Sequence, residues 1–251
     1  DFSLLNVGSG LSYYPAFGDL DNDGDEDMIV GDYHGYCYFF ENTGGVGSPA
    51  SFSTFDTLRN NVGEPIFHST YAYPAIVDLD RDGDKDIAIG RRTGAVQYYE
   101  NTGTPALMQL EFQTNNLGDV DVSEYWSIEG QAVPVFLDIE GEFNLVLGSK
   151  SGALHYYDDI EGNIAGSFNL VDSTLDNLHI GTWSAPAIFD LNGDDKFEMV
   201  LGNQRGGVAL YSSGIISQIG LKENQKLDIT VYPNPTSSEI VIRSASNDLM
   251  A

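Results

Sequence analysis

The sequence has few basic residues: eleven lysines and arginines stand against 38 aspartates and glutamates, a formal net charge of −27 at pH 7. A surface of this sign repels the phosphate backbone of nucleic acids and gives no attraction to anionic lipid. Long apolar runs are also lacking, since none approaches the roughly 18–20 residues that cross a bilayer. We therefore expect a soluble chain with no nucleic-acid partner and no transmembrane segment.

Cysteine is nearly absent as well, because Cys37 is the only one. An internal disulfide is excluded, and the alternating apolar neighbours of Cys37 predict a buried, unreactive thiol. The chain opens on Asp1 without a methionine or a signal peptide, which is expected of a processed chain or of a fragment.

Four similar segments are present instead, and such self-similarity identifies repeat architectures. They begin at Pro15, Pro74, Pro134 and Pro186 and read PAFGDLDNDGDEDMIVGDYHGYCYFFENTG, PAIVDLDRDGDKDIAIGRRTGAVQYYENTG, PVFLDIEGEFNLVLGSKSGALHYYDD and PAIFDLNGDDKFEMVLGNQRGGVALYSS. Each predicts an extended stretch, an acidic loop, a short apolar strand ending in glycine, a polar hairpin and an aromatic strand.

A fourth strand per repeat is predicted in the spacers, where residues 51–58, 110–117 and 167–175 share a Phe-led pattern with the N-terminus. Four short antiparallel strands per repeat are typical of β-propeller blades. The sequence thus predicts an all-β chain, a propeller of four-stranded antiparallel blades, followed by a short β segment at the C-terminus. Residues 1–7 could complete the last blade and close a four-bladed ring, or further blades could precede Asp1.

The acidic loops carry the clearest chemistry. In the first, acids occupy positions 1, 3, 5, 7 and 9 with glycine at position 6, and the second repeats this arrangement; the acids are Asp19, Asp21, Asp23, Asp25, Asp27 and then Asp78, Asp80, Asp82, Asp84, Asp86. Carboxylates on alternate residues of a tight loop can converge on one centre, and six to eight oxygen ligands suit Ca²⁺ better than Mg²⁺. The seventh position would supply its backbone carbonyl.

An EF-hand begins similarly but needs a glutamate at position 12 and flanking helices. Val30 and Ile89 stand there instead, within apolar residues typical of strands, so the EF-hand is excluded. The fourth loop keeps the length with altered residues and predicts a weaker site; its positions are Asp190, Asn192, Asp194, Lys196 and Glu198. The third loop is two residues shorter, keeps only Asp138, Glu140 and Asn144, and predicts no ion.

The two full motifs, DLDNDGDEDMIVG and DLDRDGDKDIAIG, each followed by a glycine hairpin and ENTG, resemble the FG-GAP or VCBS repeats of integrin α-subunit propellers and bacterial surface proteins. The resemblance covers about residues 11–214. It implies a propeller in which Ca²⁺ is held at the first hairpin of a blade in a structural role. We accordingly expect a propeller domain over residues 1–214.

A second resemblance lies beyond a linker at 215–226. The stretch VYPNPTSSEIVI looks like the opening of the type A sorting domain of the type IX secretion system of Bacteroidetes. Residues 227–251 would be part of that domain, and an ordinary β-hairpin is the alternative. The resemblance implies export to the outer surface or the medium, with the translocon and its shuttle proteins as partners during transit.

No catalytic motif is evident: the four histidines lack metal-ligand spacing, and neither a G-x-S-x-G elbow nor a Walker loop occurs. Several basic and aromatic residues fall in the polar hairpins, which would emerge on one side of a propeller; they are Tyr33, His34, Arg91, Arg92, Lys150 and Arg205. These hairpins are the hypothetical contact for an anionic ligand such as an acidic glycan.

The sequence therefore favours a secreted or cell-surface, calcium-stabilised propeller that binds a glycan or protein ligand and has no catalysis of its own. One alternative is an accessory or scaffold domain of a secreted polysaccharide-degrading enzyme. Another is a structural component of a surface assembly.

Overall fold

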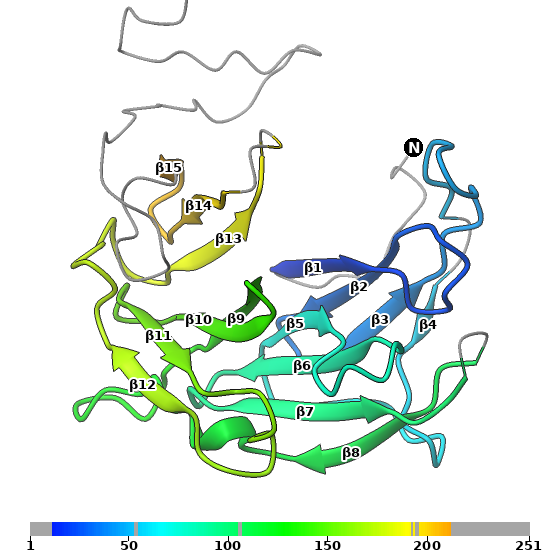
Figure 1. Ribbon diagram of the computed structural model, residues 1–251. Coiled ribbons are helices and arrows are strands. Elements are labelled where there is room, and N and C mark those ends of the chain that lie inside the picture. Colours follow the sequence, from blue (N-terminus) through cyan, green and yellow to red (C-terminus); the bar gives the residue numbers. More distant parts are fainter. Residues whose placement is uncertain (1–11, 53–54, 105–106, 192, 194–195, 212–251) are drawn as a thin grey trace, which may run out of the picture.

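The computed structural model describes residues 12–52, 55–104, 107–191, 193 and 196–211. These residues form four antiparallel sheets in a propeller-like arrangement, with the first strand of each sheet towards the centre (Figure 1). The prediction of an all-β propeller with four repeats is confirmed. Within the described part of the chain no helix is long and apolar enough to span a membrane.

Each repeat forms one blade, and the strands follow in sequence order from the centre outwards. Blade 1 consists of β1 (Tyr13–Gly18), β2 (Asp27–Asp32), β3 (Cys37–Phe40) and β4 (Asp56–Thr57). Blade 2 consists of β5 (Ala72–Val77), β6 (Asp86–Arg91), β7 (Val96–Asn101) and β8 (Leu110–Thr114). Blade 3 consists of β9 (Val133–Ile139), β10 (Glu142–Gly148), β11 (Leu154–Asp158) and β12 (Asn169–Asp172). Blade 4 shows β13 (Ala185–Phe189), β14 (Glu198–Gly202) and β15 (Val208–Tyr211).

The predicted fourth strands are present in the first three blades as β4, β8 and β12. A short 3₁₀ turn, η2 (Leu117–Asp119), follows β8. The predicted completion of blade 4 by residues 1–7 lies outside the described residues, as do the linker and the sorting-domain segment. Cys37 is buried, as predicted, and burial raises the pKa of its thiol to about 12.

The strand register places each acidic loop at the same point of its blade. β1 pairs with β2 from Tyr13 opposite Asp32 to Gly18 opposite Asp27, so the loop of residues 19–26 connects the two strands. β5 and β6 repeat this arrangement around residues 78–85. In blade 3 the pairing continues to Ile139 opposite Glu142, and only two residues remain for the turn.

That two-residue turn consists of Glu140 and Gly141, whose φ angles are 55° and 91°. Positive φ at both positions is the type I′ geometry that matches the twist of paired strands. The two-residue deletion in the third repeat has therefore turned an open loop into a tight hairpin.

Three of the four hydrophobic clusters among the described residues lie between neighbouring blades, and the fourth lies within blade 1. One cluster joins blades 1 and 2, a second joins blades 2 and 3, and a third joins blades 3 and 4. A glycine at the last or second-last position of the second strand permits this approach: a Cβ on Gly31, Gly90 or Gly148 would lie 2.0–2.2 Å from a backbone oxygen at the start of the next blade. The repeated glycine of the apolar strand is thus a blade-to-blade contact.

Candidate metal centres

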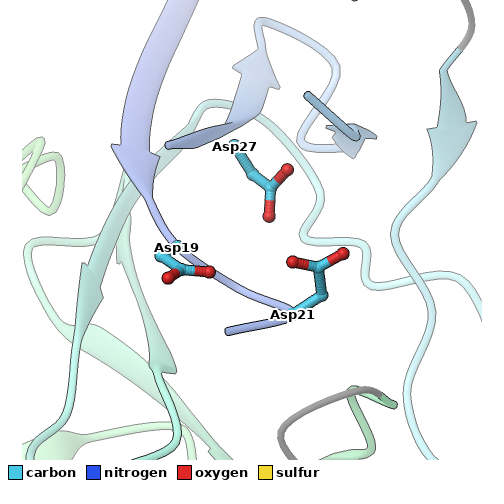
Figure 2. Close-up of side chains that lie close together, drawn as sticks. All are labelled: Asp19, Asp21 and Asp27. Atoms are coloured by element: carbon cyan, nitrogen blue, oxygen red, sulfur yellow. The ribbon is translucent and has the colours of Figure 1, made fainter. Parts of the chain in front are cut away.

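The first acidic loop brings three carboxylates together at the junction of β1 and β2. One oxygen each from Asp19, Asp21 and Asp27 lies within 4.8 Å of the others, and Figure 2 shows the three side chains facing one another. Asp27 is buried, whereas Asp19 and Asp21 are half-buried. Three carboxylates this close repel one another unless a cation lies between them.

Backbone donors fix the loop from within. The N–H of Gly24 donates to Asp19 Oδ2 at 3.0 Å, and the N–H of Asp23 donates to Asp21 Oδ1 at 3.2 Å. Gly24 adopts a φ of 91°, the left-handed turn for which the motif needs glycine. Among the described residues, buried Asp19 Oδ1 and Asp25 Oδ1 find no hydrogen-bond partner. A buried carboxylate oxygen without a partner is costly, and a bound cation satisfies it.

The second loop repeats the design with a different triad. Oxygens of Asp78, Asp80 and Asp82 lie within 4.8 Å of one another, and Asp78 Oδ1 is buried with no hydrogen-bond partner in the described structure. The N–H of Asp82 donates to Asp80 Oδ1 at 3.1 Å, while Gly83 supplies the turn with a φ of 102°. Position 1 of both loops thus has one buried, unpartnered carboxylate oxygen, which could serve as a ligand of an oxygen-seeking cation.

The acid at position 9 has a structural task that sequence reasoning missed. Asp27 accepts the N–H of Leu20 at 3.0 Å and that of Asn42 at 2.8 Å. Asp86 accepts equivalent N–H groups from Leu79 and Asn101 at 3.0 and 2.9 Å. Each carboxylate joins the loop to the third strand of its blade.

Burial raises the pKa of Asp27 and of Asp86 to about 6, although these backbone donors act in the opposite direction. The asparagine that follows the third strand completes the joint: Asn42 Oδ1 accepts N–H groups from Gly44 and Ser51. The repeated EN of the ENTG motif was the available signal for this joint.

The other predicted ligands lie outside the two triads. Asp23 accepts the N–H of Asp25, and Asp25 Oδ2 accepts the N–H of Gly45 at 2.6 Å. Asp84 donates its backbone N–H to Asp82 Oδ1 at 2.9 Å. These contacts shape the loops, and the ligand roles of these residues stay predictions.

In the fourth loop, Glu198 Oε2 accepts the N–H of Leu191 at 3.0 Å, the counterpart of the contact between Asp27 and Leu20. Asp190 Oδ1 accepts the N–H of Gly193 at 2.7 Å, and Lys196 is exposed. Asn192 and Asp194 lie outside the described residues, so the third calcium site stays a prediction.

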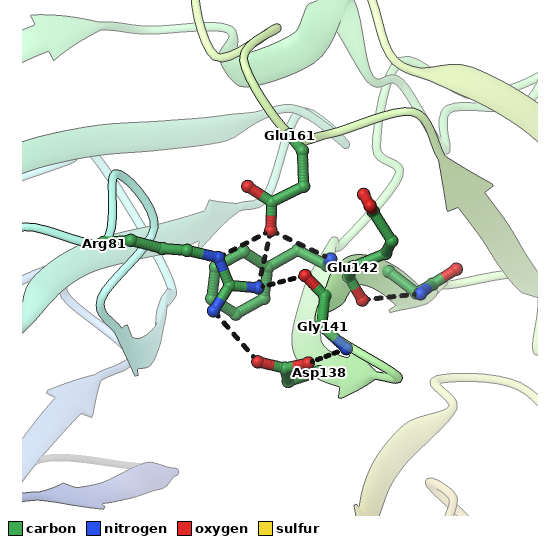
Figure 3. Close-up of polar contacts among 7 residues, drawn as sticks. Arg81, Asp138, Gly141, Glu142 and Glu161 are labelled. Carbon is green, nitrogen blue, oxygen red and sulfur yellow. Dashed lines mark hydrogen bonds and ion pairs between the residues drawn. The ribbon is translucent and has the colours of Figure 1, made fainter.

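In blade 3 an arginine side chain contacts the shortened loop (Figure 3). Arg81, from the second acidic loop, donates to Asp138 Oδ2 at 3.0 Å and to Glu161 Oε1 at 2.6 and 2.9 Å. It also donates to the carbonyl of Gly141 at 2.8 Å, and its guanidinium lies 4.1 Å from the centre of the Phe143 ring. Hydrogen bonds to Glu161 and then Asp138 raise the pKa of Arg81, so it stays charged.

Sequence reasoning predicted no ion for this loop but did not predict this contact. Arg81 lies four positions into the loop of the preceding blade, and no local pattern indicates which loop it reaches. The positive charge beside the tight hairpin of blade 3 is therefore an arginine side chain of blade 2.

Three of the hairpin residues proposed to bind a ligand have side-chain partners within the chain. Arg92 and Lys150 both form ion pairs with Glu129. Arg91 donates to His68 Nε2 at 2.9 Å, and burial followed by the Arg91 charge lowers the pKa of His68 to about 4. Glu129 was not foreseen, because it precedes the next blade and no motif marks it.

The remaining hairpin residues are placed as follows. The rings of Tyr33 and His34 lie 5.4 Å apart, and the backbone N–H of Arg205 donates to Asn203 Oδ1. Binding of an anionic ligand to these hairpins stays a prediction, and such a ligand would compete with Glu129 for Arg92 and Lys150.

Several solved structures match this chain. One, described as BBS1N in complex with ARL6DN and soaked with lead, is 14% identical with a TM-score of 0.42; the match covers 84% of this chain and 57% of that one. A second, soaked with mercury, is 13% identical with a TM-score of 0.44 and covers 84% and 58%. The chain thus spans less than three fifths of those solved chains. No curated protein matches the sequence.

Residues 19–89 match the family model described as an FG-GAP-like repeat. The matched stretch runs from Asp19, the first acid of the first triad, through the complete second loop to the strand that follows it. The resemblance drawn from the motifs is thereby supported over both triads.

Proposed function

We propose that this chain is a calcium-stabilised binding module of a secreted or cell-surface protein, with a glycan or protein as its ligand. In this proposal the calcium ions are structural: they hold the hairpin between the first two strands in blades 1 and 2. The module acts without catalysis of its own.

The observation that carries the proposal is the pair of acidic triads with unpartnered oxygens at Asp19 and Asp78. Oxygen-only donor sets, flexible loop geometry and negative charge favour Ca²⁺ over softer ions. The FG-GAP-like match over residues 19–89 supports the same assignment. Extracellular calcium is abundant enough to fill sites with dissociation constants of about 10⁻⁴–10⁻³ M.

The location outside the cell rests on that calcium argument and on the VYPNPTSSEIVI motif, which lies outside the described residues. Export would bring the chain into contact with the type IX translocon and its shuttle proteins. Fractionation of the native cells, with detection of the chain by antibody, tests this part: recovery from the cytoplasm alone would contradict it.

The calcium part is tested by equilibrium dialysis of the full chain followed by elemental analysis. We expect about two calcium ions per chain, with magnesium unable to replace them. The double variant Asp21→Asn and Asp80→Asn removes one carboxylate from each triad and should bind far less calcium at the same free concentration. Glu64→Gln changes the same charge in an exposed loop and should leave the count unchanged. A wild-type chain that emerges free of calcium would refute the proposal.

A further inference from the structure

A pocket of about 460 Å³ lies between the inner ends of the four blades, where residues of the first strands and of the segments before them face one another. All four blades contribute side chains to its wall; one from each blade in turn is Tyr14, Tyr71, Gln131 and Trp183. Its size falls within the range of about 300–1,000 Å³ that is usual for small-molecule sites. We refer to it as the axial pocket.

The wall is built from a position that recurs in every blade. The residue three places before the strand proline is Ser12, Tyr71, Gln131 and Trp183 in turn, and each has a left-handed backbone with φ between 56° and 62°. The last three donate their N–H groups to carbonyls of the preceding blade, at Tyr33, Arg92 and Lys150, over 2.9–3.1 Å. Non-glycine residues held in this conformation are uncommon and gather at ligand sites.

The charge of the pocket differs from that of the protein. The chain has a net charge of −27, yet none of the described side chains that line the axial pocket is charged. The wall consists instead of aromatic rings together with serine hydroxyls and the amides of Gln131, Asn203 and Gln204. A ligand that fits is therefore uncharged and rich in hydrogen-bonding groups.

Gln131 supplies the most specific signal. Its side chain is only 2% exposed, and its Oε1 accepts the hydroxyl of Tyr73. Its Nε2 is buried and has no hydrogen-bond partner among the described residues. Native proteins rarely leave a buried amide donor unpaired, so this Nε2 calls for an acceptor oxygen, and Gln131 is one of the residues that line the axial pocket.

The aromatic rings provide apolar faces beside that donor. Tyr71 and Trp183 meet at 68° with ring centres 5.6 Å apart, and Tyr71 lies parallel to Tyr73 at 6.1 Å. Tyr71 and Trp183 are half-buried, so part of each ring remains open to a ligand. Sugar rings combine weakly apolar C–H faces with hydroxyls that both donate and accept, which matches rings and amides side by side.

We infer that the axial pocket binds a neutral saccharide unit, with Gln131 Nε2 donating to a sugar oxygen and Trp183 and Tyr71 stacking on the ring. This inference rests on the proposed binding function and names the ligand class and the place. An anionic sugar would meet the repulsive field of the chain. A quaternary ammonium would suit the aromatic rings but has no acceptor for Gln131.

The test uses the full calcium-loaded chain with the substitution Trp126→Phe. Because the chain has two tryptophans, Trp183 is then the only one left. Trp126 is 64% exposed and lies outside the axial pocket, so this background should bind as the wild type does. Cellotetraose, xylotetraose and mannotetraose are the neutral probes, and tetramethylammonium, which has no acceptor atom, is the cationic one. We expect a neutral probe to change the Trp183 fluorescence and to give nuclear Overhauser effects to the indole protons.

Gln131→Met removes the donor at similar size and should weaken that probe at least tenfold, as should Trp183→Leu. If either variant folds poorly, the Overhauser contacts to Trp183 in the background chain still locate the ligand. A saccharide that binds without such contacts, or with affinity unchanged in both variants, would overturn the axial pocket but leave the binding module standing. Binding of tetramethylammonium alone, or of no neutral probe, would also overturn the inference, while the calcium count tests the module separately.

Discussion

Asp21→Asn tests whether the first triad is a cation site, because it should change stability in opposite directions with and without calcium. Asp21 Oδ1 accepts the N–H of Asp23 at 3.2 Å. The amide oxygen of asparagine can accept the same bond, so the turn is retained while one negative charge is removed. The substitution thus separates the charge of the triad from the geometry of the loop.

Without calcium the charge is a cost. Burial, followed by the charge of Asp23, raises the pKa of Asp21. Oxygens of Asp19 and Asp27 lie within 4.8 Å of that of Asp21. Two unit charges at such a distance repel by about 0.9 kcal/mol in water. With two such pairs removed, the calcium-free variant should be about 1–2 kcal/mol more stable than the wild type.

With calcium the charge is a ligand. A site with a dissociation constant of about 0.1 mM contributes about 2.7 kcal/mol to the free energy of unfolding at about 10 mM calcium. If the loss of one carboxylate weakens the site about 100-fold, that contribution falls to about 0.4 kcal/mol. The calcium-induced gain should therefore shrink by about 2 kcal/mol, or about 4–8 °C in melting temperature for a chain of this size.

Scanning calorimetry of the wild type and the variant, each in chelator and in calcium, measures both effects. Glu64→Gln is the matched control, since it removes a charge from an exposed loop and should move neither value by more than about 0.5 kcal/mol. A variant that is less stable than the wild type in chelator, or that keeps the full calcium gain, would refute the cation site.

Three further substitutions test the frame around the loops. Gly90→Ala puts a methyl group 2.0 Å from a carbonyl oxygen of blade 3 and should cost about 3 kcal/mol in urea unfolding, whereas Gly202→Ala, whose nearest neighbour is 3.7 Å away, should be near neutral. Asn101→Ala leaves the N–H groups of the 103–109 loop without their acceptor and should cost about 2 kcal/mol. His68 has a folded pKa of about 4, below its ordinary 6.5, so its contribution is complete above pH 6.5 and is lost as the pH falls towards 4. His68→Asn should therefore reduce the stability lost between pH 7 and pH 5 by about 1 kcal/mol, after allowing for the partial exposure of the ring; an unchanged slope would contradict the low pKa.

The parts of the fold that repeat could be predicted from the sequence. Position 1 of each acidic loop, the glycine of the apolar strand and the aromatic third strand recur at fixed spacing, and each recurrence reports one local geometry. The short fourth strands were predicted for the same reason. The sequence predicted that both loops bind a cation. It did not predict which three acids converge in each, because that depends on how the backbone of each loop turns after position 3.

Contacts that occur at only one place in the chain, rather than in every repeat, could not be predicted. Arg81 reaches Asp138 and Glu161, and Glu129 binds both Arg92 and Lys150, through pairings between blades that no repeat reports. The role of Gln131 was missed for a different reason. The residue three places before the strand proline is serine, tyrosine, glutamine or tryptophan, and the four positions share only a positive φ angle.

In blade 1 the first strand separates the proposed calcium site from the proposed saccharide site. The strand β1 contributes Tyr14 to the axial pocket near its start. It ends at Gly18, directly before Asp19, the first acid of the triad. Six extended residues span about 20 Å, so an ion in the loop cannot touch a ligand in the pocket. Calcium can affect ligand binding only by holding β1 against β2 and blade 1 against blade 2. Calcium removal should therefore weaken saccharide binding in proportion to the loss of blade stability, whereas Gln131→Met should weaken it with no change in calcium affinity.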